Sequence, residues 1–325
     1  MRKKIIILLS LILILSASIN VYAVETPNKE VSPKTIVLLH GGWHGEWSWY
    51  KVKDRLAEKG FKIVTIELPA HGNDMSCSWE TTIQDYENAI INKLDALNEN
   101  NVILVGHGTS GALISRVAEL RPDLVEKLVY VGGVVANNSE SIASILLKNY
   151  DSLALRNARV NIINGEIFIK KNMINQAIYN TISDETDLSI CDMNVQGEPM
   201  LPLLCKIGLG VNYQSTYKYY IKTLQDNCVT ANFQEKLIKK NDFEKIYDMD
   251  SCHMPFISNP IEFVDIIEEI ANQSVEPRML SRSASISFSD TNEVMEIQQE
   301  IANNTSETEM DFKKYMELFD EYQDN

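Results

Sequence analysis

The sequence predicts an α/β fold, with a mostly parallel sheet flanked by helices and an inserted helical cap, and three observations favour it. Short aliphatic runs alternate with segments of helical periodicity over residues 35–131. One of these runs, 101–105, is almost purely aliphatic, which is typical of a strand buried on both faces of a parallel sheet. After an interruption, the strand pattern returns within 217–249. Such alternation is typical of a sheet whose crossover connections are helices.

The first half of the pattern contains four strands and three helices. Each strand is followed by a loop and then by apolar residues spaced three and four apart, as on one face of a helix. Gly60 and Pro122 end two of the helices. The predicted strands are 35–39, 62–68, 101–105 and 127–131, and the predicted helices are 50–59, 82–97 and 111–120.

An insertion separates this half from the last strands. Between about 134 and 214 the alternation gives way to helix-like segments and polar loops, which we interpret as a cap. The sheet resumes with strands at 217–224 and 243–249. Pro260 then begins a last amphipathic helix over 261–271.

The C-terminal segment, 273–325, differs in composition from the folded domain expected at 33–272. It is Ser-rich near its start and holds 12 acidic against 4 basic residues, a composition that predicts a mostly disordered extension. An apolar stripe at helical spacing lies within it and forms either a marginal isolated helix or a helix that docks on the domain or on a protein partner. The stripe comprises Phe312, Tyr315, Met316, Phe319 and Tyr322.

The N-terminus, 1–23, has the features of a secretory signal peptide. Three basic residues precede an apolar run at 5–15, and the small-residue pattern Val21-Tyr22-Ala23 follows as a cleavage site. An uncleaved anchor is the alternative, but the run is shorter than the roughly 20 residues that span a bilayer. We therefore expect export to a periplasmic or secreted location, with no stable membrane span after removal of the leader.

Composition and charge exclude several classes of protein. The 325-residue chain is 45% hydrophobic and 23% charged, which excludes collagen-like, low-complexity and wholly disordered proteins. Its net charge of −15 disfavours nucleic acid as a partner. The five cysteines fit neither a zinc ribbon nor a redox CxxC motif, so they either form disulfides in an oxidising compartment or remain buried thiols.

All five histidines fall in or beside loops at the ends of predicted strands. Loops at the carboxyl ends of parallel strands are where open α/β sheets place their ligands. The most informative is the glycine-rich turn at 40–45, because glycines let backbone N–H groups point into a cavity, as an oxyanion hole requires. A purely structural turn is the alternative. The histidines are His40, His44, His71, His107 and His253.

Several motifs in order resemble those of the α/β-hydrolase superfamily, and more narrowly those of the plant methylesterase and hydroxynitrile lyase group with its bacterial relatives. The resemblance covers roughly 33–271. Its motifs are LLHGGWHGEWSWYKV at 38–52, ELPAHG at 67–72, VILVGHGTSG at 102–111, SDETDLSICDMNVQGEPMLPL at 183–203, YIKTLQDNCVTANFQ at 220–234 and DSCHMPF at 250–256. The resemblance implies an esterase-type pocket for a small apolar ester or related ligand, with no cofactor.

The resemblance also implies roles for individual residues. It makes Asp226 the acid and His253 the base of a catalytic triad, and the backbone amides of Gly42 and Thr109 the donors of an oxyanion hole. At the nucleophile position, where the family has serine, this chain has Gly108. Glycine has no side chain that an imidazole can deprotonate, so it cannot form an acyl-enzyme.

Two other residues are candidates to replace the missing nucleophile. Ser110 lies two positions later, where the first helical turn rotates its side chain by roughly 200° and moves it about 3 Å along the axis, so helix capping is its favoured alternative role. Cys252 adjoins His253, but adjacent residues seldom direct their side chains at one another. Met254 stands where the lyase branch has lysine, which disfavours lyase chemistry.

The pocket is expected to involve His40, Trp43, His44 and His107. Packing behind the turn is the alternative role for His107. His44 and His71 either line the pocket or bond to loop backbone, since no cluster of histidines and carboxylates has metal-ligand spacing.

Together these features predict an exported α/β-hydrolase-family protein that is weakly active or a ligand-binding pseudo-hydrolase. An active carboxylesterase that uses Ser110 or another displaced nucleophile is one alternative. A protein-binding module that acts through its acidic tail is another. The tail after Gln273 is expected to be removable without unfolding the domain.

The triad assignment also suggests a disulfide. Because the acid and base loops must meet at one imidazole, we expect Cys228 and Cys252 to lie close enough to pair. Cys191 and Cys205 form a weaker second candidate pair within the cap.

Overall fold

The computed structural model describes residues 33–275 and 291–323. The chain divides into two units, 1–33 and 34–325, and the described elements belong to the second. The predicted signal peptide and the Ser-rich stretch at 281–289 lie outside the described residues. Within the described ranges, no helix is long and apolar enough to cross a membrane.

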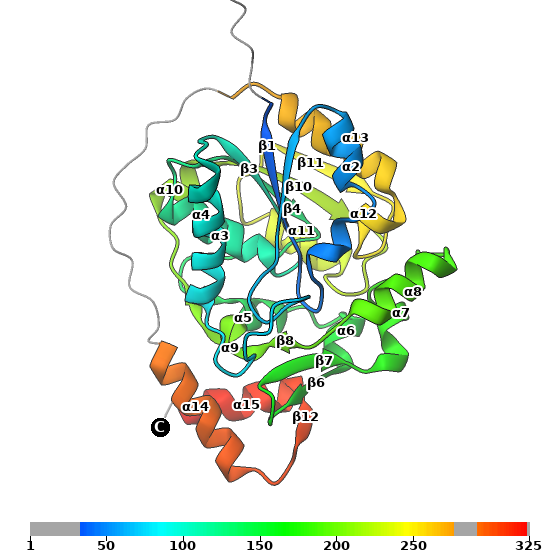
Figure 1. Cartoon of the computed structure of the whole chain (residues 1–325). Coiled ribbons are helices and arrows are strands. Elements are labelled where there is room, and N and C mark those ends of the chain that lie inside the picture. The colour runs from blue at the N-terminus through cyan, green and yellow to red at the C-terminus, as the bar shows by residue number, and fades with distance from the viewer. Residues whose placement is uncertain (1–32, 276–290, 324–325) are drawn as a thin grey trace, which may run out of the picture. The chain divides into compact units, whose positions relative to one another are not determined.

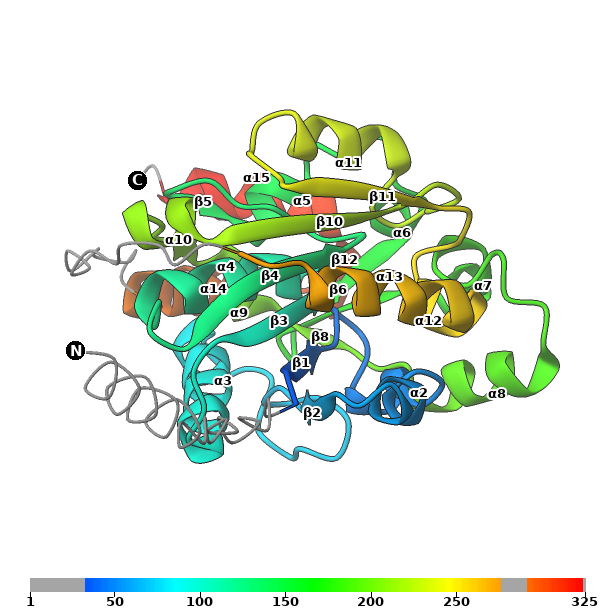
Figure 2. The same cartoon turned by 90° about the horizontal axis from the view of Figure 1, so that it is seen from above.

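A six-stranded parallel sheet forms the centre of the second unit (Figure 2). Its strands are β1 (Thr35–Leu39), β2 (Lys62–Ile66), β3 (Val102–His107), β4 (Val125–Val131), β10 (Tyr217–Thr223) and β11 (Lys245–Met249), in the spatial order β11-β10-β4-β3-β1-β2. β1 and β3 are buried along their whole length, because helices cover both faces of the sheet. The predicted fold class is confirmed.

Helices pack on both faces of this sheet. They are α2 (Lys53–Glu58), α3 (Ile83–Leu97), α4 (Ser110–Leu120), α10 (Val211–Ser215), α11 (Ala231–Ile238), α12 (Pro255–Ser258) and α13 (Pro260–Asn272), with a 3-10 helix η1 (Glu46–Trp49). Figure 1 shows α3, α4 and α10 on one face, and α2 and α13 on the other. α3 begins at a capping box, in which Thr82 and Asp85 exchange side-chain-to-backbone hydrogen bonds.

The chain between β4 and β10, predicted to be a cap, consists of short elements. Its helices are α5 (Ile142–Leu146), α6 (Leu153–Arg156), η2 (Lys171–Met173), α7 (Ile174–Ala177), α8 (Glu185–Asn194) and α9 (Met200–Leu204). Its strands are β5 (Glu140–Ser141), β6 (Ala158–Asn161), β7 (Glu166–Ile169), β8 (Glu198–Pro199) and β9 (Lys206–Ile207). β6, β7 and β8 form an antiparallel sheet. Strands of this length are too short to show a period-two pattern in the sequence.

The C-terminal segment is not the mostly disordered tail that its composition predicted. Its described part forms α14 (Thr291–Asn304), β12 (Glu309–Asp311) and α15 (Phe312–Gln323). β12 pairs with β6 and becomes an outer strand of the cap sheet, and α14 and α15 lie beside the cap (Figure 1). The apolar stripe is buried, with at most 5% exposure for Phe312, Tyr315, Met316 and Phe319. Composition misled because the acidic residues share two amphipathic helices with apolar faces.

All five cysteines are free thiols, so neither predicted disulfide is formed. One cysteine is exposed and the other four are buried. The Cys228 thiol lies beside the imidazole of His253 rather than bonded to Cys252. Two cysteines near one imidazole need not form a disulfide, because the bond also requires that their Cβ vectors be directed at one another.

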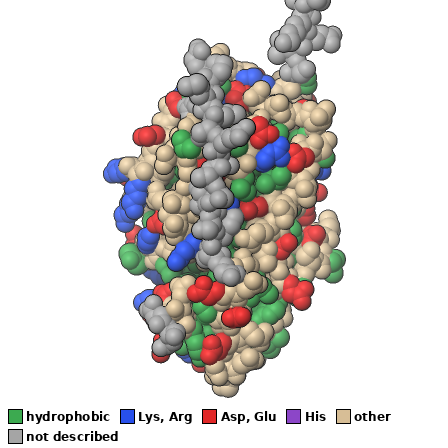
Figure 3. All heavy atoms as spheres, turned by 90° about the vertical axis from the view of Figure 1, so that its left-hand side faces the viewer, with side chains coloured by type: hydrophobic (Ala, Val, Ile, Leu, Met, Phe, Trp, Pro, Cys, Tyr) green, Lys and Arg blue, Asp and Glu red, His purple; other side chains and the backbone are tan. Residues whose placement is uncertain are grey.

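Charged side chains of both signs cover the surface. On the face shown in Figure 3, carboxylates are spread widely, whereas Lys and Arg side chains gather along one side. The chain has 45 acidic and 30 basic residues, so carboxylates are the more frequent charge.

Candidate active site

The position predicted for the nucleophile lies at a sharp turn between β3 and α4. Gly108 has a φ of +54°, a left-handed conformation that residues with a side chain disfavour. Its carbonyl accepts hydrogen bonds from the backbone amides of Gly111 and Val134, which fix the turn. A Cβ atom on Gly108 would lie 3.3 Å from Nε2 of His253. Any side chain at this turn would therefore contact that imidazole.

The structure brings His253 and Asp226 into a buried pair. Nδ1 of His253 lies 2.8 Å from Oδ2 of Asp226. Burial alone lowers the pKa of His253, but the Asp226 carboxylate and the neighbouring Cys228 outweigh it and raise that pKa well above its usual value. Nδ1–H donates to the carboxylate, and Nε2 faces the Gly108 turn. This is the geometry of an acid–base pair directed at a position without a side chain.

Besides His253, four donors hold the Asp226 carboxylate, and the sequence predicted none of these four. Oδ1 accepts from the backbone amides of Cys228 and Val229 at 2.7 and 2.8 Å. Oδ2 accepts from Thr223 Oγ1 at 2.8 Å and from Gln234 Nε2 at 3.3 Å. All four donors are close to Asp226 in sequence, yet nothing in their spacing distinguishes them from surface polar residues.

Gly132, directly after β4, leaves space for this pair. Its φ is +49°, and a Cβ atom there would lie 2.9 Å from Thr223 Oγ1, 3.1 Å from Asp226 Oδ2 and 3.6 Å from His253 Nδ1. A side chain at this position would push those polar groups apart. The Gly-Gly pair after a strand is the sequence signal that could have identified it.

The glycine-rich loop after β1 approaches the same turn, but its amides are engaged within the protein. The Gly42 amide donates to Oγ1 of Thr109 at 2.9 Å. Trp43 has a φ of +65°, and its amide donates to Oε2 of Glu198 at 3.0 Å. The expected open oxyanion hole is therefore not present in this conformation, because a threonine hydroxyl accepts from one of its two proposed donors.

Glu198, in the cap strand β8, also forms a buried ion pair that the sequence did not predict. Its Oε2 lies 2.7 Å from Nε2 of His71. Burial lowers the pKa of His71, but the Glu198 carboxylate outweighs it and raises that pKa above its usual value. His71 also bonds to loop backbone through the Pro69 carbonyl, which was one of its two predicted roles. The pair joins the cap to the loop after β2.

His40 and His44 both bond to loop backbone, which was one of the two predicted roles of His44 but not the pocket role predicted for His40. Nδ1 of each donates to a carbonyl of the glycine-rich loop, at 3.0 and 2.7 Å respectively. Nε2 of His40 accepts from the Leu68 amide, and Nε2 of His44 accepts from the Tyr179 hydroxyl. Burial lowers the pKa of both, that of His44 to about 3. They are neutral imidazoles that fix the loops around the turn.

His107 packs behind the turn, which was its predicted alternative role. Its Nε2 donates to the backbone carbonyl of His253 at 2.9 Å, and the two rings lie 4.4 Å apart. Its other face contacts the edge of Phe256. Burial, together with the nearby His253, lowers the pKa of His107 well below its usual value, so this imidazole is also neutral.

Both alternative nucleophiles are buried. The Ser110 hydroxyl is fully buried and donates to the His40 carbonyl. It does not cap α4, because the N-cap residue is Thr109 and no side chain caps that helix, which corrects the predicted capping role. Cys252 is buried, and its backbone amide donates to Thr181 Oγ1 at 2.9 Å.

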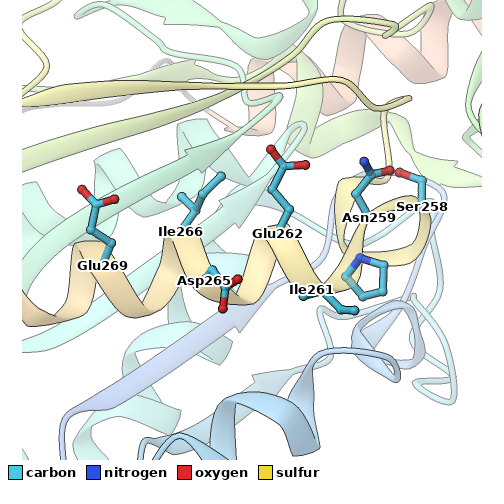
Figure 4. A pocket seen from close by; sticks show the side chains of 8 residues that line it. Ser258, Asn259, Ile261, Glu262, Asp265, Ile266 and Glu269 are labelled. Atoms are coloured by element: carbon cyan, nitrogen blue, oxygen red, sulfur yellow. The ribbon is translucent and has the colours of Figure 1, made fainter.

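Trp43, the remaining predicted pocket residue, lines a cavity of about 270 Å³ with cap residues that include Phe168 and Gln196. A second cavity, of about 590 Å³, is an open groove along α12 and α13, where carboxylates alternate with apolar side chains (Figure 4). That groove includes neither the Gly108 turn nor the Asp–His pair. Among the described residues, no three His, Cys, Asp or Glu side chains form a group that could hold a metal ion.

A capped parallel sheet with an Asp–His pair facing a sharp strand-to-helix turn defines a protein of the α/β-hydrolase class. The model of the alpha/beta hydrolase family matches residues 36–266, and the chain belongs to that family. Within it, the chain is methylesterase-like, as its sequence relatives show. The α14–α15 segment lies outside the matched residues.

Sequence relatives and solved structures agree on this placement. "Putative methylesterase 11, chloroplastic" of Arabidopsis thaliana is 32% identical over 250 residues, which cover 73% of this chain, and the chain spans only 64% of that relative's length. Methylesterase 7 of the same plant is 28% identical over 260 residues, covering 74% of this chain and 97% of the relative. An extracellular alpha/beta-hydrolase from a Paenibacillus species shares the fold, with a TM-score of 0.64 at 20% identity, over 74% of this chain and 100% of that one.

Proposed function

We propose that this protein is an exported methylesterase-like hydrolase whose catalytic triad lacks its nucleophile, so that it binds a small apolar ester or a related ligand with little turnover. The position of Gly108 carries this proposal. A serine there would have its Cβ atom 3.3 Å from Nε2 of His253, which puts its hydroxyl within hydrogen-bond reach of the imidazole. Glycine leaves the acid–base pair without a hydroxyl to deprotonate.

The chemistry of ester cleavage explains why this substitution matters. In a serine esterase the imidazole takes the serine proton while the serine oxygen attacks the carbonyl carbon. Here Nε2 of His253 faces the turn, but Gly108 offers no oxygen, so no acyl-enzyme forms there. Loss of the serine from such a unit costs on the order of 10⁶ in turnover. Binding and amide donors alone leave an acceleration of about 10³ to 10⁴ over water, which supports weak activity.

The ligand class rests on the relatives and on burial. The relatives are named methylesterases, and a methyl ester is small, neutral and largely apolar. The side chains of Asp226 and His253 are at most 4% exposed. A charged ligand would lose its hydration in such a site, so a neutral one is favoured.

The active-esterase alternative has less support. The Ser110 hydroxyl already donates to the His40 carbonyl and would have to leave that contact to meet the imidazole of His253. The protein-binding alternative, which acts through the acidic tail, also has less support, because Phe312, Tyr315, Met316 and Phe319 of the apolar stripe are buried within this chain.

Export remains part of the proposal on the strength of the N-terminal sequence. Basic residues, an apolar run and a small-residue site follow one another in the order that a signal peptidase substrate needs. Expression in a bacterial host followed by N-terminal sequencing of the exported fraction tests this. A mature chain beginning at Val24 is expected, whereas an intact leader in the cell interior would contradict export.

The substitution Gly108→Ser tests the central proposal. Because His253 and Asp226 already face this position, the variant should hydrolyse a short activated ester, p-nitrophenyl acetate, at least about tenfold faster than the parent. Serine at a positive φ costs about 1 to 3 kcal/mol, which a domain of this size tolerates.

Two controls accompany this measurement. The double variant Gly108→Ser with His253→Ala should lose the gained activity, because the new hydroxyl then has no base. Ser110→Ala in the parent should change nothing. A folded Gly108→Ser protein without gain, or a parent with rapid turnover that Ser110→Ala abolishes, would refute the vacated triad.

A further inference from the structure

We propose that the Thr109 hydroxyl occupies the oxyanion hole of this site, so that Gly108 is not the only departure from an active esterase. The hydroxyl accepts the hydrogen bond of the Gly42 amide, which is the bond that the carbonyl oxygen of an ester would need. This inference rests on the proposed function and identifies Thr109 as a second residue that limits the reaction.

The geometry of the Gly42 amide is the first support. Its nitrogen lies 2.9 Å from Oγ1 of Thr109. Donors of an oxyanion hole lie about 2.7 to 3.1 Å from the oxyanion. The threonine oxygen therefore stands at the distance from this amide that a substrate oxyanion would take.

The environment of Thr109 is the second support. Thr109 is the N-cap residue of α4, where a hydroxyl usually accepts from an amide of the first helical turn. Its side chain makes no such capping bond. The hydroxyl is directed away from its own helix and across to the loop that follows β1.

Glu198 is the third support, because its carboxylate also lies next to Gly42. A Cβ atom on Gly42 would lie 3.1 Å from Oε2 of Glu198 and 3.6 Å from Oγ1 of Thr109. The same carboxylate accepts from the Trp43 amide. Two successive amides of the loop are thus satisfied by protein acceptors, one of them a carboxylate that would repel negative charge developing on a bound oxygen.

A ligand oxygen can reach the Gly42 amide only if the Thr109 side chain rotates and gives up its hydrogen bond. The net free energy of such a hydrogen bond changes an equilibrium constant by roughly 2- to 13-fold. Removing the hydroxyl should therefore raise the activity of a protein that has regained its serine by a factor in that range.

The activity experiment uses Gly108→Ser as its parent and adds either Thr109→Ala or Thr109→Ser. Alanine removes the competing oxygen, whereas serine retains it on a smaller side chain. We expect kcat/KM for p-nitrophenyl acetate to rise about 2- to 13-fold with Thr109→Ala and to stay close to its starting value with Thr109→Ser. Equal values for the two variants, with unchanged melting temperatures, would overturn the inference.

A second measurement is independent of catalysis. In protein labelled with ¹⁵N-glycine, the Gly42 amide signal is assigned by its loss in Gly42→Ala. With Gly108 unchanged, Thr109→Ala should shift this signal upfield and speed its hydrogen exchange at least about tenfold, whereas Thr109→Ser should leave both close to the parent. A Gly42 amide that is insensitive to Thr109→Ala would refute the inference.

The two measurements separate the failure of this inference from the failure of the proposed function. The Gly42 signal can change with Thr109→Ala while none of the variants that carry Gly108→Ser gains activity. In that case the Thr109 contact is supported and the proposal of a triad without a nucleophile fails. Gly108→Ser can instead gain activity that depends on His253 while Thr109→Ala changes neither the Gly42 signal nor kcat/KM. In that case the proposal of a triad without a nucleophile is supported and this inference fails.

Discussion

Two glycines at strand ends decide what the Asp226–His253 pair can do. Gly108 and Gly132 both have positive φ, at +54° and +49°, and both approach the imidazole of His253. At the first, no side chain fills the position that Nε2 of His253 faces. At the second, the missing side chain lets Thr223, Asp226 and His253 meet, so glycine is structurally required there.

Gly132→Ala should therefore destabilise the fold by more than a positive φ alone accounts for. Its Cβ would lie 2.9 Å from Thr223 Oγ1, so the hydrogen bonds of Asp226 would have to move. The matched control is Gly60→Ala, where φ is +90° and nothing lies within 4 Å of the added Cβ. Urea unfolding should show a loss of about 1 kcal/mol for Gly60→Ala and about 2 to 4 kcal/mol for Gly132→Ala. Equal losses would contradict the crowding argument.

The site residues that motifs could reveal differ from those that they could not. Gly108, Asp226 and His253 stand in recognisable local sequences, so the resemblance assigned them directly. Glu198 and His71 are 127 positions apart, and their ion pair exists only because the cap folds over the loop after β2. Motifs and residue spacings within one segment cannot predict a contact between residues so far apart in the sequence.

At the scale of elements, periodicity predicted the six strands of the central sheet, the helices α2, α3, α4 and α13, and the helical stripe of α15, but not the strands of the cap or β12. The strands of the sheet are runs of five to seven residues that contain many aliphatic, β-branched or aromatic side chains, and they are long enough to be distinct. β12 has three residues and forms only because β6 offers it an edge. Its existence depends on tertiary contact, as does the burial of the stripe on α15.

Deletion of residues 291–325 should lower the melting temperature by more than about 4 °C, in contrast to the removable tail that composition predicted. The deletion uncovers the β6 edge and the surface beneath α14 and α15. For a domain of this size, roughly 2 to 4 °C corresponds to each 1 kcal/mol of lost stability. A truncated protein that melts with the parent would show that the C-terminal helices contribute nothing.

Single substitutions on α15 refine that experiment. Phe319→Ala removes a ring that is 4% exposed. The free energy of unfolding should fall by about 3 to 5 kcal/mol, as it does for such substitutions in a protein core. Glu317→Ala, on the exposed face of the same helix, removes only a surface pair with Lys313 and should change stability by less than about 0.5 kcal/mol. Similar melting of the two variants would mean that the stripe is not packed.

At the scale of the whole molecule, the five histidines are all buried, but their pKa values are shifted in two opposite directions. Burial lowers the pKa values of His40, His44 and His107, so the unfolded chain binds more protons than the folded one below about pH 6.5. Carboxylates raise the pKa values of His71 and His253, so the stability that they add is present below about pH 6.5 and lost as pH rises through the folded values. The histidine contribution is therefore greatest near pH 6.5.

The free energy of unfolding should fall on the acid side of this maximum. Each neutral buried histidine contributes up to about 1.4 kcal/mol per pH unit below about pH 6.5. His44→Asn retains a side-chain donor for the loop carbonyl and removes one such titration, so its slope between pH 6.0 and 5.0 should be shallower by up to that amount. Urea unfolding of both proteins measures this, and identical slopes would show that His44 is not a neutral buried group.

The sequence by itself determined the α/β class, the order of the sheet elements along the chain and the family, because each is written in local periodicity or in a contiguous motif. Only the tertiary structure decided that residues 291–323 are folded, that the cysteines are unpaired, that the Thr109 hydroxyl accepts from the Gly42 amide and that Glu198 pairs with His71. The physical reason is that burial and hydrogen bonding depend on which distant segments meet, and those meetings follow from packing of the whole chain and not from the residues beside them.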